Sequence, residues 1–163
     1  MIVVSDASPL TNLAAIRRMS LLREVYGRVL VPAGVAAELL EGERRGDHPP
    51  MLQATEWLEV CEVVDKTAVE QLLLEVDRGE AEAIVLAMEK HADLLLMDER
   101  IGRSVAARRG VRTVGLLGTL VAAKHKELIP AVRPILDELI DDAGFWVDRQ
   151  LYANVLRQVG ESG

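Results

Sequence analysis

The stretch GEAEAIVLAMEKHADLLLMDER, residues 79–100, combines a helical pattern with a strand pattern. Residues 80–91 have the apolar spacing of a helix, and DLLLM at 93–97 is a short, continuous apolar run. Such a run is typical of a strand in a parallel sheet that is buried from both sides, because it lacks the alternation of a half-exposed strand. Two glutamates stand at the head of the helix, and Asp98 follows the strand. The stretch therefore predicts a helix and a buried strand with carboxylates at their ends.

The same alternation of strand and helix patterns extends over most of the chain. Strand-like runs also occur at 2–5, 28–31, 58–64 and 111–115, and helical spacing occurs near 9–25, 33–41, 66–76, 100–109 and 117–126. Strands that alternate with helices predict a mainly parallel sheet covered on both faces. We therefore expect an α/β fold, a three-layer α/β/α sandwich. The polar stretch at 41–50 is rich in breakers and predicts a mobile surface loop.

After Pro130 the pattern changes to two helices with no strand between them, at about 131–142 and 147–159. They predict a C-terminal helical hairpin, 131–160, appended within a single domain that spans 1–163. Most of the few aromatic residues lie in this hairpin: Phe145, Trp146 and Tyr152. Packing within the chain is the simpler interpretation, because exposed apolar patches are the exception in monomers. The alternative is a dimer contact, and a homodimer is the expected assembly.

Composition excludes several classes of protein. The single cysteine, Cys61, rules out an intrachain disulfide and a multi-cysteine zinc site, and it agrees with a reducing compartment. No stretch approaches the roughly 20 apolar residues of a membrane span, and the first residues lack the pattern of a secretion signal. We therefore expect a cytoplasmic protein that has no membrane partner.

Charge and aromatic content limit how the chain can bind nucleic acid. A net charge of -7 argues against tight, purely electrostatic binding. An aromatic content of 3% nearly excludes a base-stacking platform, so single-strand readers built on exposed aromatics do not fit. One segment is nevertheless basic and free of carboxylates, with Arg100, Arg103, Arg108, Arg109, Arg112, Lys124 and Lys126. This segment predicts a local basic face on an acidic protein.

Two aspartates are predicted at the ends of parallel strands, where open α/β sheets have their ligand crevice. Asp6 follows the first strand, and the next residues fit a helix start with Ser8 as N-cap and Pro9 at the first helical position. Asp98 follows the buried strand of the opening stretch. Local alternatives exist for both positions, since Asp6 can form a turn and either Asp98 or Glu99 can cap the next helix.

Glutamates on two predicted helices add to these aspartates. Glu38 is the one charge among the apolar first turns of the helix at 33–41, and a solvated helix position is the alternative. Glu80 and Glu82 are two positions apart, so on a regular helix they point about 200° from each other. Asp77 and Glu80 also fit a capping box, which offers Glu80 a purely structural role.

Several motifs together resemble the PIN-domain nucleases over nearly the whole chain. They are DASPL at 6–10, GEAEAI at 79–84, GRSVAARRG at 102–110, VGLLGTLVAAK at 114–124 and the tail GFWVDRQLYANVLRQVGE at 144–161. The resemblance implies a PIN-like fold and a nuclease that depends on Mg²⁺ or Mn²⁺. Many members of this family are ribonuclease toxins that a small antitoxin protein neutralises.

The resemblance also implies roles for the carboxylates. The implied catalytic set is Asp6, Glu38, Glu82 and Asp98, and the implied metal ligands are these four with Glu80 and Glu99. Setting AEAIVLA beside the toxin-type pattern puts Glu82 on the ligand position and leaves Glu80 as an auxiliary. The family often has aspartate at that third position, so Glu82 is a departure. Ser8 is expected to support Asp6 or to serve only as a helix cap.

The predicted function is therefore a metal-dependent endoribonuclease that hydrolyses phosphodiester bonds with a metal-activated water. RNA is the expected substrate, with DNA left open, and a small antitoxin is the expected partner if the chain is a toxin. Arg100 and Arg103 are the expected phosphate contacts, with surface solvation as the alternative. A rival prediction is a non-catalytic PIN-like module that binds RNA or protein. A phosphatase fits less well, because Ser8 breaks the DxD spacing that such chemistry favours.

Overall fold

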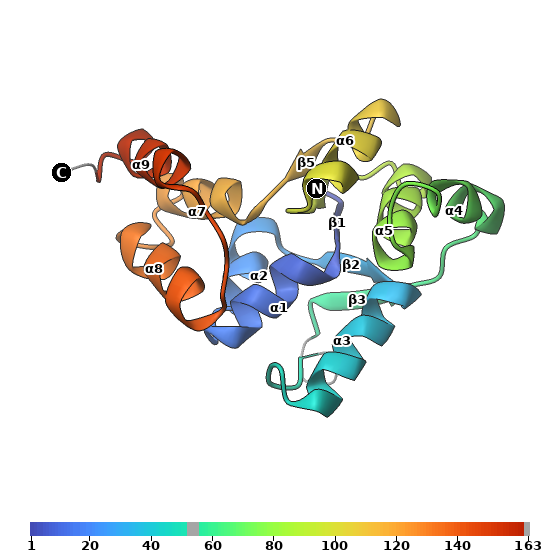
Figure 1. The fold of residues 1–163 in the computed structure, drawn as a ribbon, viewed down its shortest axis with the longest axis horizontal. Coiled ribbons are helices and arrows are strands. Elements are labelled where there is room, and N and C mark those ends of the chain that lie inside the picture. Colours follow the sequence, from blue (N-terminus) through green and yellow to red (C-terminus); the bar gives the residue numbers. More distant parts are fainter. Residues whose placement is uncertain (52–55, 162–163) are drawn as a thin grey trace.

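The computed structural model describes residues 1–51 and 56–161 and has a parallel sheet at its centre (Figure 1). Within these residues five strands pair in the order β3-β2-β1-β4-β5, and every pairing is parallel. The strands are β1 (Val3–Ser5), β2 (Val29–Pro32), β3 (Leu58–Cys61), β4 (Leu94–Leu96) and β5 (Thr113–Val114). The prediction of an α/β fold with a parallel sheet flanked by helices is confirmed.

Helices connect the strands and follow the last of them. They are α1 (Ala7–Ala15), α2 (Ser20–Tyr26), α3 (Ala33–Arg45), α4 (Lys66–Leu72), α5 (Arg78–Glu89), α6 (Arg100–Arg108), α7 (Leu116–His125), α8 (Arg133–Asp142) and α9 (Arg149–Gln158). Adjacent strand residues point to opposite faces of the sheet. Val3 belongs to the core cluster with α1, α2, α7 and α8, whereas Val4 belongs to the cluster with α4, α5 and α6. Both faces are thus covered, which explains the continuous apolar strand runs.

One predicted helix is interrupted. Residues 9–25 belong to two helices, α1 and α2, and Arg17 between them has a left-handed backbone with a φ of 59°. The backbone N–H of Arg18 donates to the carbonyl of Leu13 at 2.8 Å, which closes the end of α1. The break turns the chain so that α2 packs against α7 and β2.

The segment at 41–50 is a loop only in its second half, whereas its polar composition predicts a surface loop throughout. Helix α3 continues to Arg45 and ends at Gly46, which has a left-handed φ of 77°. His48, beyond the helix end, is buried. The prediction was wrong for 41–45, because the polar residues there lie mostly on the exposed side of a helix, where they carry no information about a loop.

The C-terminal helices α8 and α9 pack onto the main core. Phe145 and Tyr152 contact the core cluster, and the Tyr152 hydroxyl donates to the Asp137 carboxylate at 2.6 Å. Packing within the chain is therefore confirmed for these two aromatic residues. Trp146 differs, since it is 80% exposed. No helix of the described residues is long and apolar enough to cross a bilayer.

The strand order creates a switch point between β1 and β4. From β1 the sheet extends through β2 to β3 on one side and through β4 to β5 on the other. Open α/β sheets bind ligands outside the carboxyl ends of the strands at such a point. Asp6 directly follows β1, and Asp98 lies two residues beyond the end of β4. The topology therefore brings both aspartates to the same edge of the sheet.

Candidate functional site

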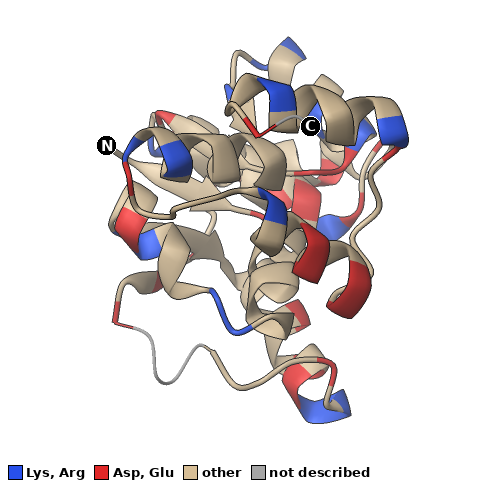
Figure 2. Ribbon diagram, turned by 90° about the vertical axis from the view of Figure 1, so that its left-hand side faces the viewer, with Lys and Arg blue, Asp and Glu red and all other residues tan. Residues whose placement is uncertain are grey.

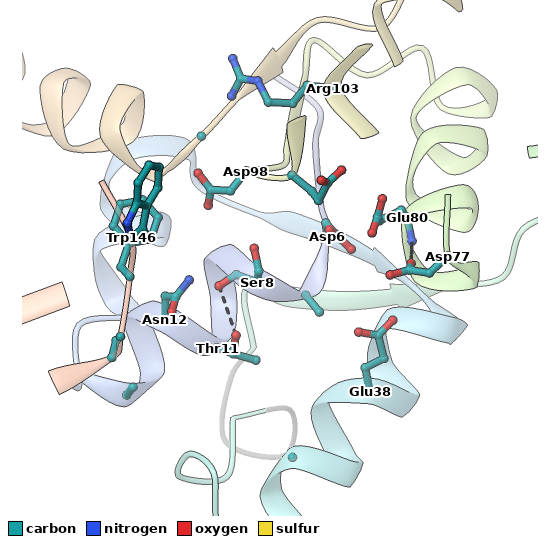
Figure 3. A pocket seen from close by; sticks show the side chains of 18 of the residues that line it. Asp6, Ser8, Thr11, Asn12, Glu38, Asp77, Glu80, Asp98, Arg103 and Trp146 are labelled. Carbon is teal, nitrogen blue, oxygen red and sulfur yellow. Dashed lines mark hydrogen bonds between the residues drawn. The ribbon is translucent and has the colours of Figure 1, made fainter. Parts of the chain in front are cut away.

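A cleft of about 1840 Å³ opens at this edge. Its lining includes carboxylates from several segments of the chain: Asp6, Glu38, Asp77, Glu80, Asp98 and Glu99. Figure 3 shows Glu38, Asp77 and Glu80 grouped on one side of the view, with Asp6 and Asp98 nearer its centre. The cleft thus collects acidic side chains that are far apart in the sequence.

Asp6 is buried at the junction of β1 and α1. It occupies the N-cap position of α1, but its side chain makes no capping hydrogen bond. Burial raises the pKa of Asp6 to about 6, and the negative charges of Asp77, Asp98 and Glu99 add to the effect, while the backbone amide of Ala7 opposes it. The side chain is therefore held in a place that disfavours its charged form.

Asp98 has one carboxylate oxygen engaged and one free. Its Oδ1 accepts a hydrogen bond from the backbone N–H of Leu116, the first residue of α7, at 2.9 Å. Its Oδ2 is buried and has no hydrogen-bond partner among the described residues. Burial raises the pKa of Asp98, while the Leu116 amide and the Arg103 charge oppose the shift. A buried oxygen without a partner is costly unless a ligand binds it.

Glu38 reaches the cleft from α3 and lies against the first turn of α5. A Cβ atom at Gly79 would collide with Oε1 of Glu38, so the glycine of the GEAEA motif allows the carboxylate to approach α5. The residue as a whole is exposed. Burial of its carboxyl group nevertheless raises the pKa of Glu38 to about 7, and the charges of Asp6, Asp77 and Glu82 contribute further.

Glu80 lines the cleft from the first turn of α5. Its backbone N–H donates to Oδ1 of Asp77 at 2.8 Å, so the predicted N-cap at Asp77 is confirmed. Burial raises the pKa of Glu80 to about 8, and the adjoining Asp77 carboxyl and the charges of Asp6 and Glu99 add to the shift. Asp77 thus caps the helix and also places a second carboxylate beside Glu80.

Glu82 binds α3 instead of lining the cleft. Its Oε1 accepts a hydrogen bond from the backbone N–H of Gly34, in the first turn of α3, at 2.9 Å. A Cβ atom at Gly34 would lie 3.0 Å from Cδ of Glu82, so this contact also depends on a glycine. The two glutamates diverge, as helical geometry requires, but Glu80 is the one in the cleft. This arrangement runs against the preference for Glu82 that the sequence suggested.

Two side chains at the start of α6 form hydrogen bonds with the backbone. Oε2 of Glu99 accepts a hydrogen bond from the Gly102 amide at 2.9 Å, so Glu99 caps the helix, which was its structural alternative. Arg103 donates from Nη1 to the carbonyl of Met97 at 3.2 Å. Arg100 is exposed and, within 1–51 and 56–161, its side chain has no hydrogen bond or ion pair. Both arginines line the cleft.

Ser8 lies inside α1 and does not cap it. The helix begins at Ala7 and Asp6 holds the N-cap position, so the predicted N-cap at Ser8 is wrong. Pro9 is still tolerated, because an amide in the first turn of a helix has no partner within the helix. The Ser8 carbonyl accepts a hydrogen bond from the Thr11 hydroxyl at 3.2 Å, and the Ser8 side chain lines the cleft.

The basic segment after Arg100 does not form a separate face. Figure 2 shows basic and acidic residues interspersed over the visible elements. Arg108 pairs with Glu75, and Lys124 pairs with Glu161 at 3.2 Å. Among the described residues, carboxylates from other parts of the chain therefore pair with two of the seven basic residues of this segment.

Comparison with known proteins agrees with this architecture. The PIN-domain family model matches residues 2–161. The chain therefore belongs to the PIN-domain family. PIN domains are commonly metal-dependent nucleases, and they typically bind Mg²⁺ or Mn²⁺. No curated protein and no solved structure matches the chain.

The carboxylates of this PIN domain suit a hard divalent cation. Mg²⁺ and Mn²⁺ prefer oxygen ligands, and the unpartnered Oδ2 of Asp98 offers one. Burial, and then the neighbouring negative charges, raise the pKa values of Asp6, Glu38 and Glu80, and a bound cation would favour their charged forms. In the part of the chain that is described, no three His, Cys, Asp or Glu side chains converge closely enough to hold an ion. The donor set fits chemically, but its members are spread around the cleft.

Two residues of the PIN-domain cleft were not among the predicted site residues. Asp77 had been interpreted only as a helix cap, and the signal for more was its position beside Glu80 at the same helix start. Trp146 lines the cleft from the loop between α8 and α9. No local pattern predicts that placement, because it depends on how α8 packs against α1 and α9 against α7.

Proposed function

We propose that this PIN domain is a divalent-metal-dependent endoribonuclease. The observation that carries the proposal is the buried, unpartnered Oδ2 of Asp98 in a cleft that it shares with Asp6, Glu38 and Glu80. A bound Mg²⁺ or Mn²⁺ would neutralise charge on the phosphodiester and activate a water for hydrolysis. In that reaction the water oxygen bonds to phosphorus and the bond to the leaving oxygen breaks.

The acidic residues fall into two groups, those whose side chains are available to a metal ion and those whose side chains serve mainly to accept a backbone hydrogen bond at a helix start. Asp6 and Asp98 would hold an ion from the ends of two strands, and Glu38 and Glu80 would hold it from α3 and α5, in part through the waters that Mg²⁺ keeps. Glu82 and Glu99 accept backbone hydrogen bonds at the starts of α3 and α6 and would act as positioning residues. Arg100 and Arg103 would bind the phosphates that flank the scissile bond, because their guanidinium groups line the same cleft.

The test is cleavage of end-labelled RNA by the purified protein with Mn²⁺ or Mg²⁺. Asp6→Asn and Asp98→Asn should each lower the rate at least ~100-fold, since each removes a charged oxygen from the ion. Asp141→Asn is the matched control, because Asp141 is exposed on α8 and does not line the cleft. Thermal unfolding of every variant separates lost chemistry from lost folding. Full activity in both cleft variants, or in EDTA, would refute the proposal.

A non-catalytic module that binds RNA or protein is the second candidate. Three of the acidic side chains already have structural roles, which favours this candidate. Glu82, Glu99 and Oδ1 of Asp98 each accept a hydrogen bond from a backbone N–H at a helix start. This candidate predicts RNA binding that does not need a divalent ion and no cleavage at any metal concentration. The assay above therefore distinguishes the two functions.

The proposal extends to the toxin of a toxin–antitoxin pair and to a homodimer. Family membership supports this extension. If it is correct, expression should arrest growth, and co-expression of a small protein from the adjoining open reading frame should restore it. Growth arrest should disappear with Asp98→Asn. Light scattering of the purified chain measures the oligomeric state directly.

A further inference from the structure

Trp146 is an exposed aromatic residue in the wall of the cleft that contains the carboxylates. It is 80% exposed, whereas Phe145 and Tyr152 of the same C-terminal region pack against the core. Figure 3 shows Trp146 and Asn12 on the side of the view away from Asp77 and Glu80. A large apolar ring in water is therefore placed next to the candidate site.

The backbone around Trp146 holds its ring outward. Phe145 and Val147, its neighbours on either side, both pack against the core. The backbone N–H of Phe145 also donates to the carbonyl of Leu139, near the end of α8, at 2.9 Å. Because both neighbours pack against the core, the loop holds the ring in place on the cleft wall. A ligand that stacks on the ring therefore loses little binding free energy to the ordering of the loop.

Polar groups that can bind the edge of a planar ligand line the same cleft from α1. Ser8 and Asn12 line the cleft, and neither side chain has a hydrogen-bond partner within the described ranges. The Asn12 amide offers a donor and an acceptor side by side, which matches the edge of a nucleobase.

We propose that Trp146, Asn12 and Ser8 form a subsite for one unpaired nucleobase next to the scissile phosphate. The base stacks on the indole ring, and its edge bonds to the Asn12 amide and the Ser8 hydroxyl. This subsite rests on the proposed nuclease function and selects single-stranded substrate, because a paired base cannot leave its stack without cost. One stacking residue requires no aromatic platform, so the low aromatic content does not conflict with it.

Binding is tested in the Asp6→Asn protein, which keeps the substrate intact during the measurement. Fluorescence anisotropy with a labelled short oligoadenylate gives the affinity, and an RNA duplex of the same length is the comparison. Trp146→Ala should weaken binding of the single strand roughly tenfold, and Trp146→Phe should retain most of the affinity. Leu74→Ala is the control, since Leu74 is 91% exposed and does not line the cleft.

A fluorescence signal from Trp146 itself adds a readout that a structural role would not give. In a Trp57→Phe background Trp146 is the one remaining tryptophan, and the oligonucleotide should quench its emission. Asn12→Ala should weaken binding by a smaller factor and should leave the quenching in place. Equal affinity of the Trp146→Ala and parent proteins overturns the subsite, as does a change in oligomeric state with unchanged affinity.

The active protein distinguishes failure of the subsite from failure of the proposed function. If both hold, Trp146→Ala raises KM for single-stranded RNA and leaves kcat nearly unchanged. Cleavage with an unchanged KM in Trp146→Ala refutes the subsite and leaves the nuclease. Quenching of Trp146 by RNA without cleavage in Mn²⁺ refutes the nuclease but retains the subsite as a binding site.

Discussion

The strand-borne and the helix-borne carboxylates of the cleft are held in different ways. Asp6 and Asp98 follow β1 and β4, which pair directly, so the hydrogen bonds of the sheet determine where their backbones lie. Glu38 and Glu80 project from α3 and α5, and their separation depends on how closely two helices pack. The positions of Asp6 and Asp98 follow from the order of the strands. The positions of Glu38 and Glu80 depend on the contact between α3 and α5, which includes Gly34 and Gly79.

The largest expected effect separates Glu80 from Glu82. Glu80→Gln should lower metal-dependent cleavage by ~100-fold, because it removes a carboxyl group that a bound ion would hold in its charged form. Glu82→Gln should keep most of the activity, since a glutamine oxygen can still accept the Gly34 hydrogen bond. Both variants are compared by single-turnover cleavage and by titration of Mn²⁺.

A larger loss in Glu82→Gln than in Glu80→Gln would support the interpretation from the family pattern, in which Glu82 is the metal ligand. If Glu82→Gln loses metal binding and Glu80→Gln retains it, Glu82 must leave Gly34 and turn into the cleft when the ion binds. Such a result would show that the helix-borne half of the site rearranges, and that only the strand-borne half is preformed.

Gly79→Ala tests how much the helix-borne half depends on close packing. Alanine in place of glycine normally stabilises a helix by about 1 kcal/mol. Here the new Cβ would collide with Glu38, so we expect a net loss of ~1–3 kcal/mol in the free energy of unfolding by urea. Glu38→Ala added to Gly79→Ala should remove most of this loss. If Gly79→Ala is stabilising by itself, Glu38 does not lie against α5.

The strand-borne half was predictable from sequence, and the reason is topological. Alternating strands and helices predict a parallel sheet, and any side chain just beyond a strand then lies at the carboxyl edge. Asp6 and Asp98 were located correctly at this edge by that reasoning alone. The length of α3 was not predicted, because residues 41–45 carry polar side chains that suit a loop or a solvent-facing helix equally well.

The helix-borne half was only partly predictable. Helical geometry required Glu80 and Glu82 to diverge, but choosing between them needs the position of the partner helix. The Gly34 amide on α3 binds Glu82, and this contact joins residues that are far apart in the sequence. Trp146 depends in the same way on long-range packing, so no local pattern pointed to it.

The pH dependence of stability gives a smaller test of the shared negative charge. The pKa values of Asp6, Glu38 and Glu80 are raised to about 6, 7 and 8. Each group binds more protons in the folded state than in the unfolded state between about pH 4 and its raised pKa. Stability from these groups is therefore fully present below about pH 4 and is lost as the pH rises towards 8.

The melting temperature in EDTA is expected to fall between pH 5 and pH 8, and Mg²⁺ or Mn²⁺ should offset the fall at pH 8 more than at pH 5. Asp6→Asn should flatten the dependence, since it removes one of the titrating groups. A control at Asp141→Asn should leave the slope unchanged. A melting temperature that rises over this range in EDTA would mean that burial and mutual repulsion do not raise the pKa values of these carboxyl groups in the free protein.

The smallest expected effect concerns the contact that places α3 on α5. Pro32 holds the N-cap position of α3 and provides no capping side chain, so the Glu82 carboxylate serves this helix start from outside. Glu82→Ala should therefore cost about 1 kcal/mol of unfolding free energy. Cleavage should fall only modestly. Glu38 on α3 would be less well positioned, while Asp6 and Asp98 keep their places at the ends of the strands.

Urea unfolding and cleavage rates of Glu82→Ala and Glu82→Gln measure the two effects separately. Equal stability of the two variants would show that the Gly34 hydrogen bond contributes nothing, and the position of α3 on α5 would then have to come from packing alone.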